Sequence, residues 1–456
     1  MQTMFPGIVN SPITVLNGDI DSTQTTITVT DPSKFPSAPN EATIGTGEDA
    51  ETITYTGISG NDLTGCTRGF EGTAKAWSSG ASIGRNFTNY DYSSIVANIL
   101  TSVQTDHLSS YYHSIAMQRQ AIINGNIDVY QRGLSFTNPV HTSYTLDRYR
   151  LVYIVDGGIL PSNIVHSRQL LTPGDILNSF YFYRINVDGT GSNFGTNSIY
   201  QISQRIENGV KYLCGLNKKV TLSFYARSSI TNKRIGVSID TIYGSGGSLT
   251  ASETINGSNF TLTPTWTKYT YTFTTNTLVG KTFGTDNNDN IQVNFRMLWG
   301  TFYNSQVGAS TPETFVGAGD IDLAQIQVCA GDVALPFTPK SFNDELLACQ
   351  RYYYHSWDDG INSPNSGSVS GVSSATNNII CSFRFPTPMR ISPTLQIKND
   401  NTDKQVRVTA TNAKVSFNTV NYSGNRKGFS YLYDSGGTPF TVGTYYDFDL
   451  IADAEI

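Results

Sequence analysis

Hydrophobic and polar residues alternate with a period of two in many short segments of this chain. Successive side chains of a strand point to opposite faces, so such a segment predicts a strand with one buried face. Turn dipeptides such as Asn124-Gly125 and Asn256-Gly257 separate several of them. The pattern is found at residues 26–30, 52–56, 220–226, 235–239, 269–273 and, with Leu298 interrupting it, 291–299. It predicts a mainly β protein built from sandwich or jelly-roll domains.

Residues 91–122 break this pattern, because their apolar side chains recur at steps of three and four. This spacing predicts one amphipathic helix or two short ones. Two interpretations remain open from the residues alone. The apolar stripe packs against the protein's own domains, or it forms a short coiled coil around an oligomer axis. The residues that would form such a contact are Val96, Ile99, Val103, Leu108 and Ile115.

Four parts follow from these signals. Residues 1–88 form a small β-module, 89–123 a helical connector, 124–340 a large sandwich and 341–456 a second β-domain. Pro336 and Pro339 mark the boundary before the last part, because proline cannot continue a central strand. Residues 341–350 are expected to add a helical turn or two, with Asn343 or Asp344 near the start, and the Gly- and Ser-rich residues 360–377 an exposed loop.

Composition supports this outline and gives little information about partners. Charged residues make up only 14% of the chain, whereas 26 tyrosines and 23 phenylalanines favour strands. A net charge of −6 without a long basic run argues against nucleic-acid binding. Five widely spaced cysteines without a CxxC pair predict reduced thiols in a protein made in a cytoplasm. We expect neither a signal peptide nor a membrane span.

Catalytic patterns are missing from the sequence. No phosphate-binding loop, GxSxG elbow or HxxxH pair is present, and Asp358 and Asp359 are adjacent, so on a strand they would point to opposite faces. We therefore expect a protein that is not an enzyme and needs no cofactor. A structural calcium ion is the one open possibility, held either by the polar run 285–290 or by Asn126, Asp128, Asp320 and Asp322 from the two ends of the sandwich.

Aromatic residues beside amides and carboxylates are the best indication of a ligand. Sugar rings stack on aromatic side chains, and their hydroxyl groups are bound by Asp, Asn and Arg. Two clusters of this kind lie in the last domain. The candidate receptor-binding residues are Trp357, Asp358 and Asp359 in the first cluster and Tyr422, Asn425 and Arg426 in the second.

Four segments together resemble bacteriophage tail-fibre and baseplate proteins. Residues 52–73 are similar to an N-terminal module of such proteins. Residues 124–133 with 144–149 resemble the start of a carbohydrate-binding-like sandwich, although Tyr130 and Tyr149 stand where tryptophan is frequent. Residues 346–353, Leu-Leu-Ala-Cys-Gln-Arg-Tyr-Tyr, resemble the opening of a distal fibre domain, and residues 452–456 are similar to fibre C-termini.

This resemblance implies a homotrimeric fibre subunit of the virion tail, made in the host cytoplasm. Its N-terminal module would dock to the tail, baseplate or an adaptor protein, and its last domain would bind a host surface receptor, a glycan in particular. The resemblance shifts the interpretation of residues 91–122 towards a three-helix bundle. The alternatives are a purely structural baseplate or collar component and a capsule depolymerase.

Overall fold

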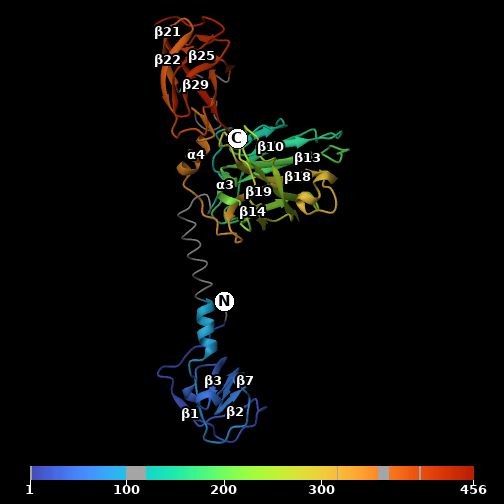
Figure 1. Ribbon diagram of the computed structural model, residues 1–456, viewed down its shortest axis with the longest axis vertical. Coiled ribbons are helices and arrows are strands. Elements are labelled where there is room, and N and C mark those ends of the chain that lie inside the picture. Colours follow the sequence, from blue (N-terminus) through green and yellow to red (C-terminus); the bar gives the residue numbers. More distant parts are fainter. Residues whose placement is uncertain (1–2, 99–119, 316, 358–368, 400–401) are drawn as a thin grey trace. The chain divides into compact units, whose positions relative to one another are not determined.

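The computed structural model describes residues 3–98, 120–315, 317–357, 369–399 and 402–456. The chain divides into two compact units, Met1–Tyr111 and Tyr112–Ile456. Most of the regular structure in the described residues is antiparallel β-sheet (Figure 1). Among the described residues no helix is long and apolar enough to cross a membrane.

The first unit contains a five-stranded and a three-stranded sheet around one apolar core. The five-stranded sheet has the order β1 (Ile13–Val15), β8 (Ser82–Gly84), β3 (Asn40–Ile44), β4 (Glu51–Tyr55) and β7 (Thr67–Glu71). The smaller sheet has the order β2 (Ile27–Thr28), β6 (Asp62–Thr64) and β5 (Gly57–Ser59), and the 3₁₀ turns η1 (Pro32–Lys34) and η2 (Gly47–Asp49) connect strands.

The predicted connector begins as a helix, since residues 89–98 are helical. Asp91 lies in its first turn and forms an ion pair with buried Arg85, which follows β8 (Nη1 to Oδ2, 2.7 Å). Arg85 also pairs with Glu41 of β3 at 2.9 Å. The start of the helix is therefore anchored to the β-module. Val96 lies in this helix, whereas Ile99, Val103, Leu108 and Ile115 lie outside the described residues.

The second unit starts with a sandwich of two antiparallel sheets. One has the order β10 (Arg150–Ile154), β13 (Ile199–Glu207), β18 (Asn290–Trp299), β15 (Arg234–Ile242) and β16 (Glu253–Thr261). The other has the order β17 (Thr267–Thr274), β14 (Lys219–Ser228), β19 (Gly317–Ala330), β12 (Tyr181–Gly189), β11 (Ile164–Leu170) and β9 (Ser135–Thr137). Short helical segments are α3 (Gly209–Leu213), η3 (Thr301–Tyr303) and η4 (Ser305–Val307).

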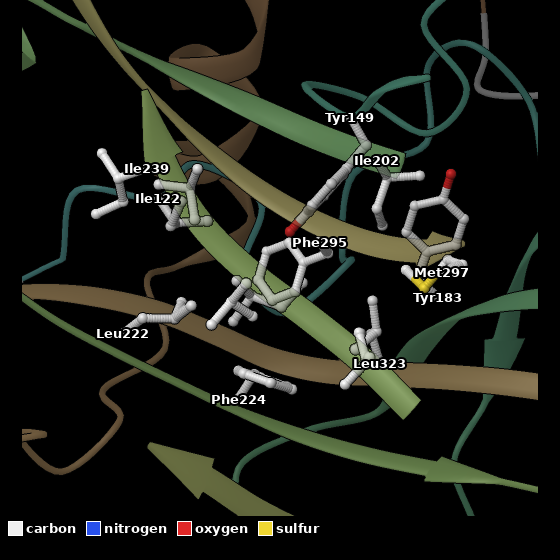
Figure 2. Packing of buried hydrophobic residues seen from close by; sticks show 14 of the residues in the cluster. Ile122, Tyr149, Tyr183, Ile202, Leu222, Phe224, Ile239, Phe295, Met297 and Leu323 are labelled. Carbon is white, nitrogen blue, oxygen red and sulfur yellow. The ribbon is translucent and has the colours of Figure 1, made fainter. Parts of the chain in front are cut away.

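The sandwich core lies between these sheets. Figure 2 shows Leu222 and Phe224 of β14 and Leu323 of β19 directed towards Ile202 of β13 and Phe295 of β18. The irregular pattern at 291–299 also has a physical explanation. Tyr200 pairs with Leu298, whereas the next residue, Gln201, pairs with Arg296. Met297 therefore forms a bulge in β18, and both Met297 and Leu298 are buried.

The last domain forms around a second core of this unit. It begins with α4 (Phe342–Gln350), whose N-cap is Ser341 rather than a later residue, since the Ser341 hydroxyl accepts a bond from the Asp344 amide at 3.2 Å. Its strands are β20 (Tyr353–His355), β21 (Val369–Ala375), β22 (Asn378–Arg384), β23 (Thr394–Asn399), β24 (Thr402–Asp403), β25 (Gln405–Val408), β26 (Lys414–Ser416), β27 (Asn421–Asn425), β28 (Gly428–Tyr433) and β29 (Tyr445–Asp453).

Long β29 organises this domain. Its first half pairs with β21 and β25, and its second half pairs with β20 and β23. From β21 the sheet continues through β22 and β28 to β27 at the edge. Part of the segment expected to be a loop is therefore strand β21.

Candidate functional site: a tyrosine surface on the last domain

The outer side of β22, β28 and β27 brings two tyrosines together with polar residues. On β28, Tyr431 lies opposite Ile380 of β22 and Ser423 of β27. Tyr433 lies opposite Asn378 and Asn421 on the same two strands. The residue between the tyrosines is buried Leu432, which faces the core. Because side chains alternate along a strand, Tyr431 and Tyr433 both face outwards.

The two rings form the wall of a shallow hollow. Their centroids are 6.0 Å apart and their planes are tilted by 48°. The hollow has a volume of about 310 Å³ and is lined by Asn377, Asn378, Tyr422, Ser423, Tyr431 and Tyr433. Tyr431 is 38% exposed, so its ring is available to a ligand. Aromatic rings flanked by amides and hydroxyl groups provide both an apolar face and hydrogen-bonding partners.

A second hollow of about 350 Å³ adjoins the first at Ser423. It is more polar, and glycine gives it its shape. A Cβ atom on Gly428 would lie 2.1 Å from the Phe383 carbonyl oxygen, and the φ of +152° also disfavours other residues there. The side chains that contribute polar groups to it are Ser382, Arg384, Ser423, Asn425 and Ser430. We refer to the residues lining both hollows as the tyrosine surface.

The second predicted cluster lies at this surface, but its members differ in role. Asn425 lines the polar hollow, and its Oδ1 accepts a bond from the Lys427 amide at 2.8 Å, which fixes the turn. Arg426 lies exposed in that turn. Tyr422 packs against the core, and its hydroxyl donates to the Pro393 carbonyl at 2.5 Å. Tyr422 is thus held mainly by structural contacts.

The first predicted cluster lies elsewhere. Trp357 follows β20 and stacks on His355, with ring centroids 4.2 Å apart and planes tilted by 19°. Burial lowers the pKa of His355 to about 4. Trp357 does not line either hollow of the tyrosine surface. Asp358 and Asp359 lie outside the described residues.

The structure gives the proposed calcium ligands other partners. Asp322 forms ion pairs with Arg184 (2.7 Å) and Arg227 (2.9 Å), and the Asn126 amide contacts Asp128 and the Asn178 carbonyl. In the run 285–290, Asp286 accepts bonds from backbone amides and Asp289 pairs with Lys211, so the run is a hydrogen-bonded turn. No group of three or more acidic, histidine or cysteine residues able to hold a metal occurs in the described part of the chain.

A larger groove of about 770 Å³ lies on the sandwich, but its chemistry differs. The Arg168 guanidinium lies 3.3 Å from the ring centre of Tyr181 and 4.2 Å from that of Tyr130, so it already occupies one face of each ring. Large apolar side chains at its edge are exposed, with Leu177 80% and Leu170 70% exposed. The groove therefore offers apolar packing more than recognition of hydroxyl groups.

Three of the four segments that carry the fibre resemblance meet in a buried joint between the sandwich and the last domain. Arg148 lies 3.5 Å from the ring centre of Tyr352, and Arg132 lies 3.6 Å from that of Tyr353. Both arginines pair with Glu455. We refer to these five residues as the arginine joint. Its role is structural, because Arg148 is only 1% exposed.

Neighbouring contacts extend the arginine joint. Arg351 of the same segment pairs with Glu207 of β13 at 2.6 Å, and the Tyr352 hydroxyl donates to Glu207 at 2.8 Å. The Gln131 amide donates to the Tyr353 carbonyl at 3.0 Å. Burial raises the pKa of the adjacent Asp147 to about 6. The sandwich and the last domain are thus held together by charged and aromatic side chains of both.

Comparison with known proteins found matches among solved structures, and not among family models or curated proteins. A protein of Bacteroides thetaiotaomicron with a provisional sugar-binding assignment is 11% identical with a TM-score of 0.28. The match covers 47% of this chain and 100% of that protein. The N-terminal cellulose-binding domain of Cellulomonas fimi β-1,4-glucanase C shares 11% identity and a TM-score of 0.23, over 43% and 100%.

A family 11 carbohydrate-binding module of Clostridium thermocellum, solved with a mixed-linked tetrasaccharide, shares 10% identity and a TM-score of 0.23, over 43% of this chain and 96% of its own. TM-scores this low do not establish a shared fold. The two-sheet sandwich of the second unit is instead established by its own strand order and core.

Proposed function

We propose that this protein is a glycan-binding subunit of a bacteriophage tail fibre, and that its tyrosine surface binds a saccharide of the host cell surface. The observation that carries the proposal is the pair of outward tyrosines on β28, flanked by Asn378 of β22 and by Asn421 and Ser423 of β27. Aromatic rings stack on the apolar C–H face of a sugar, and the flanking amides bind its hydroxyl groups.

Substitution of the two rings tests this proposal. Each of Tyr431→Ala and Tyr433→Ala removes one stacking face, and we expect about tenfold weaker glycan binding, as for an aromatic residue central to an interface. Tyr445→Ala is the matched control, because Tyr445 is a 65% exposed tyrosine of the same domain that does not line the surface. Binding is measured with the full chain on a glycan array and by calorimetry. Equal effects of all three substitutions would argue against this site.

The virion context rests on the segments that resemble fibre proteins. In this proposal the subunit is a homotrimer, its first unit docks to the tail or baseplate, and the protein resides in the virion. Three weak glycan sites in one particle would act together and raise avidity without new contacts. Light scattering of the purified chain tests the trimer, and a labelled antibody against the first unit, viewed on intact particles, tests its placement at the tail.

The proposed role requires no catalytic step. A depolymerase is the competing function, and release of reducing sugar from host polysaccharide would establish it, with Asp358→Asn and Asp359→Asn abolishing that release. A structural baseplate or collar component is the other competitor. It predicts that the tyrosine variants adsorb to host cells as well as the unchanged protein does.

A further inference from the structure

The charged side chains in and beside the polar hollow of the tyrosine surface are all basic. Arg384 of β22 and Asn425 of β27 both lie opposite Gly428 of β28. Arg426 and Lys427 form the turn between Asn425 and Gly428, so three basic residues are gathered at one corner. All three are exposed. We refer to Arg384, Arg426 and Lys427 as the basic corner.

The charges of the basic corner are not neutralised by the described parts of the protein. In the described part of residues 341–456, Arg351 pairs with Glu207 and Arg407 pairs with Asp447, whereas Arg384, Arg426 and Lys427 form no ion pair with a described residue. The described residues that line the two hollows include no aspartate or glutamate. The chain as a whole carries a net charge of −6, so the basic corner is opposite in sign to the molecule around it.

Hydrogen-bond donors accompany this charge. The hydroxyl groups of Ser382 and Ser423 line the same hollow as Arg384, whereas the Ser430 hydroxyl donates to the Ser423 carbonyl at 3.3 Å. The Oδ1 atom of Asn425 is engaged by the Lys427 amide, which leaves the Nδ2 group of Asn425 as a donor. A guanidinium with surrounding hydroxyl and amide donors is suited to an anionic oxygen group, which accepts hydrogen bonds but donates none.

From this arrangement, and resting on the proposed function, we infer that the saccharide bound by the tyrosine surface is anionic. One sugar ring stacks on Tyr431 and Tyr433. The acidic group of an adjoining sugar lies over the polar hollow, where the Arg384 guanidinium donates hydrogen bonds to it. The group that Arg384 binds is an anionic oxygen group of the saccharide, either the carboxylate of a uronic acid or a phosphate ester. A neutral glycan would leave Arg384 without a partner and would gain only the stacking contribution.

Matched saccharides test this inference. Oligosaccharides that contain uronic acid are compared on one array with the same molecules after reduction of each carboxyl group to an alcohol, and with analogues that carry a phosphate instead. We expect the acidic members to bind at least about tenfold more tightly than the reduced ones at low salt, with the difference shrinking as screening increases from 50 to 200 mM salt. Preference for the uronate or the phosphate members identifies the source of the anion.

Variants of the full chain complete the test. Arg384→Gln should lower the ratio of the affinities for acidic and reduced members from about tenfold towards one. Lys404→Gln removes the same charge from an exposed turn of the same domain and should leave the preference intact. Equal binding of acidic and reduced members, unaffected by Arg384→Gln, would overturn the inference while glycan binding stands. Binding of no saccharide, acidic or neutral, would overturn the proposed function as well.

Discussion

Removal of the Glu455 carboxylate is the sharpest test of the arginine joint. Glu455 pairs with both Arg132 and Arg148, and the three side chains are 5%, 10% and 1% exposed. In Glu455→Ala the Arg148 guanidinium stays buried without its counter-charge, and Arg132 keeps only its 3.6 Å pair with Asp453. Breaking a buried pair in this way costs about 3–5 kcal/mol, since the lost attraction no longer offsets the removal of the charges from water.

Urea unfolding of the full chain measures this cost. With an m-value of about 3 kcal/mol/M, we expect the transition of the second unit to shift by roughly 1–1.7 M. Asp332→Ala breaks the exposed Lys219–Asp332 pair of the same unit and serves as the control, with little expected change. The double variant Arg148→Met/Glu455→Ala should be more stable than the sum of its single variants, because it leaves one unpaired charge fewer. A cost of Glu455→Ala below about 1 kcal/mol would refute a buried, charge-paired joint.

Two further predictions concern single side chains. The Tyr422 ring lines the first hollow but its hydroxyl donates to the Pro393 carbonyl, so Tyr422→Phe should lower the unfolding free energy by about 1 kcal/mol and leave glycan binding unchanged; weaker binding would mean that the hydroxyl contacts the saccharide. Burial lowers the pKa of His166, between the hydroxyls of Tyr183 and Tyr200, to about 3. The unfolded chain therefore binds a proton first, and stability should fall by up to about 1.4 kcal/mol per pH unit below pH 6.5, with a shallower fall in His166→Gln.

The strands of the sandwich were predictable because their environment is regular. In β14, β15 and β17 the apolar side chains of one face pack into the core and small or polar residues stand between them, so the alternation of period two survives in the sequence. Strand β21 was missed because its two valines, Val369 and Val372, are three residues apart and its other residues are Ser, Gly and Ala. It forms through pairing with β29 and β22, where a Cβ atom on Gly371 would lie 2.5 Å from Ile379. A strand that depends on close approach of its neighbours has no periodic signal of its own.

The candidate site was only partly predictable for a related reason. Aromatic and amide composition indicated Tyr422 and Asn425, yet the outward pair is Tyr431 and Tyr433. Irregular register between Ser423 and Gly424 and between Ile380 and Phe383 changes which residues of these strands face outwards. A single bulge reverses the facing of every later residue, and one sequence does not locate it. No sequence pattern indicated that Arg384 belongs to the site, because its proximity to Asn425 depends on the order of the strands in the sheet.

The arginine joint and the tyrosine surface involve separate residues of the second unit. In the joint, Glu455 pairs with Arg132 and Arg148, and these two arginines lie over the rings of Tyr353 and Tyr352. None of these residues lines the tyrosine surface. Substitutions on β22, β27 and β28 that change the bound saccharide therefore leave the joint's ion pairs intact. A protein organised in this way keeps its domain connection while its ligand changes.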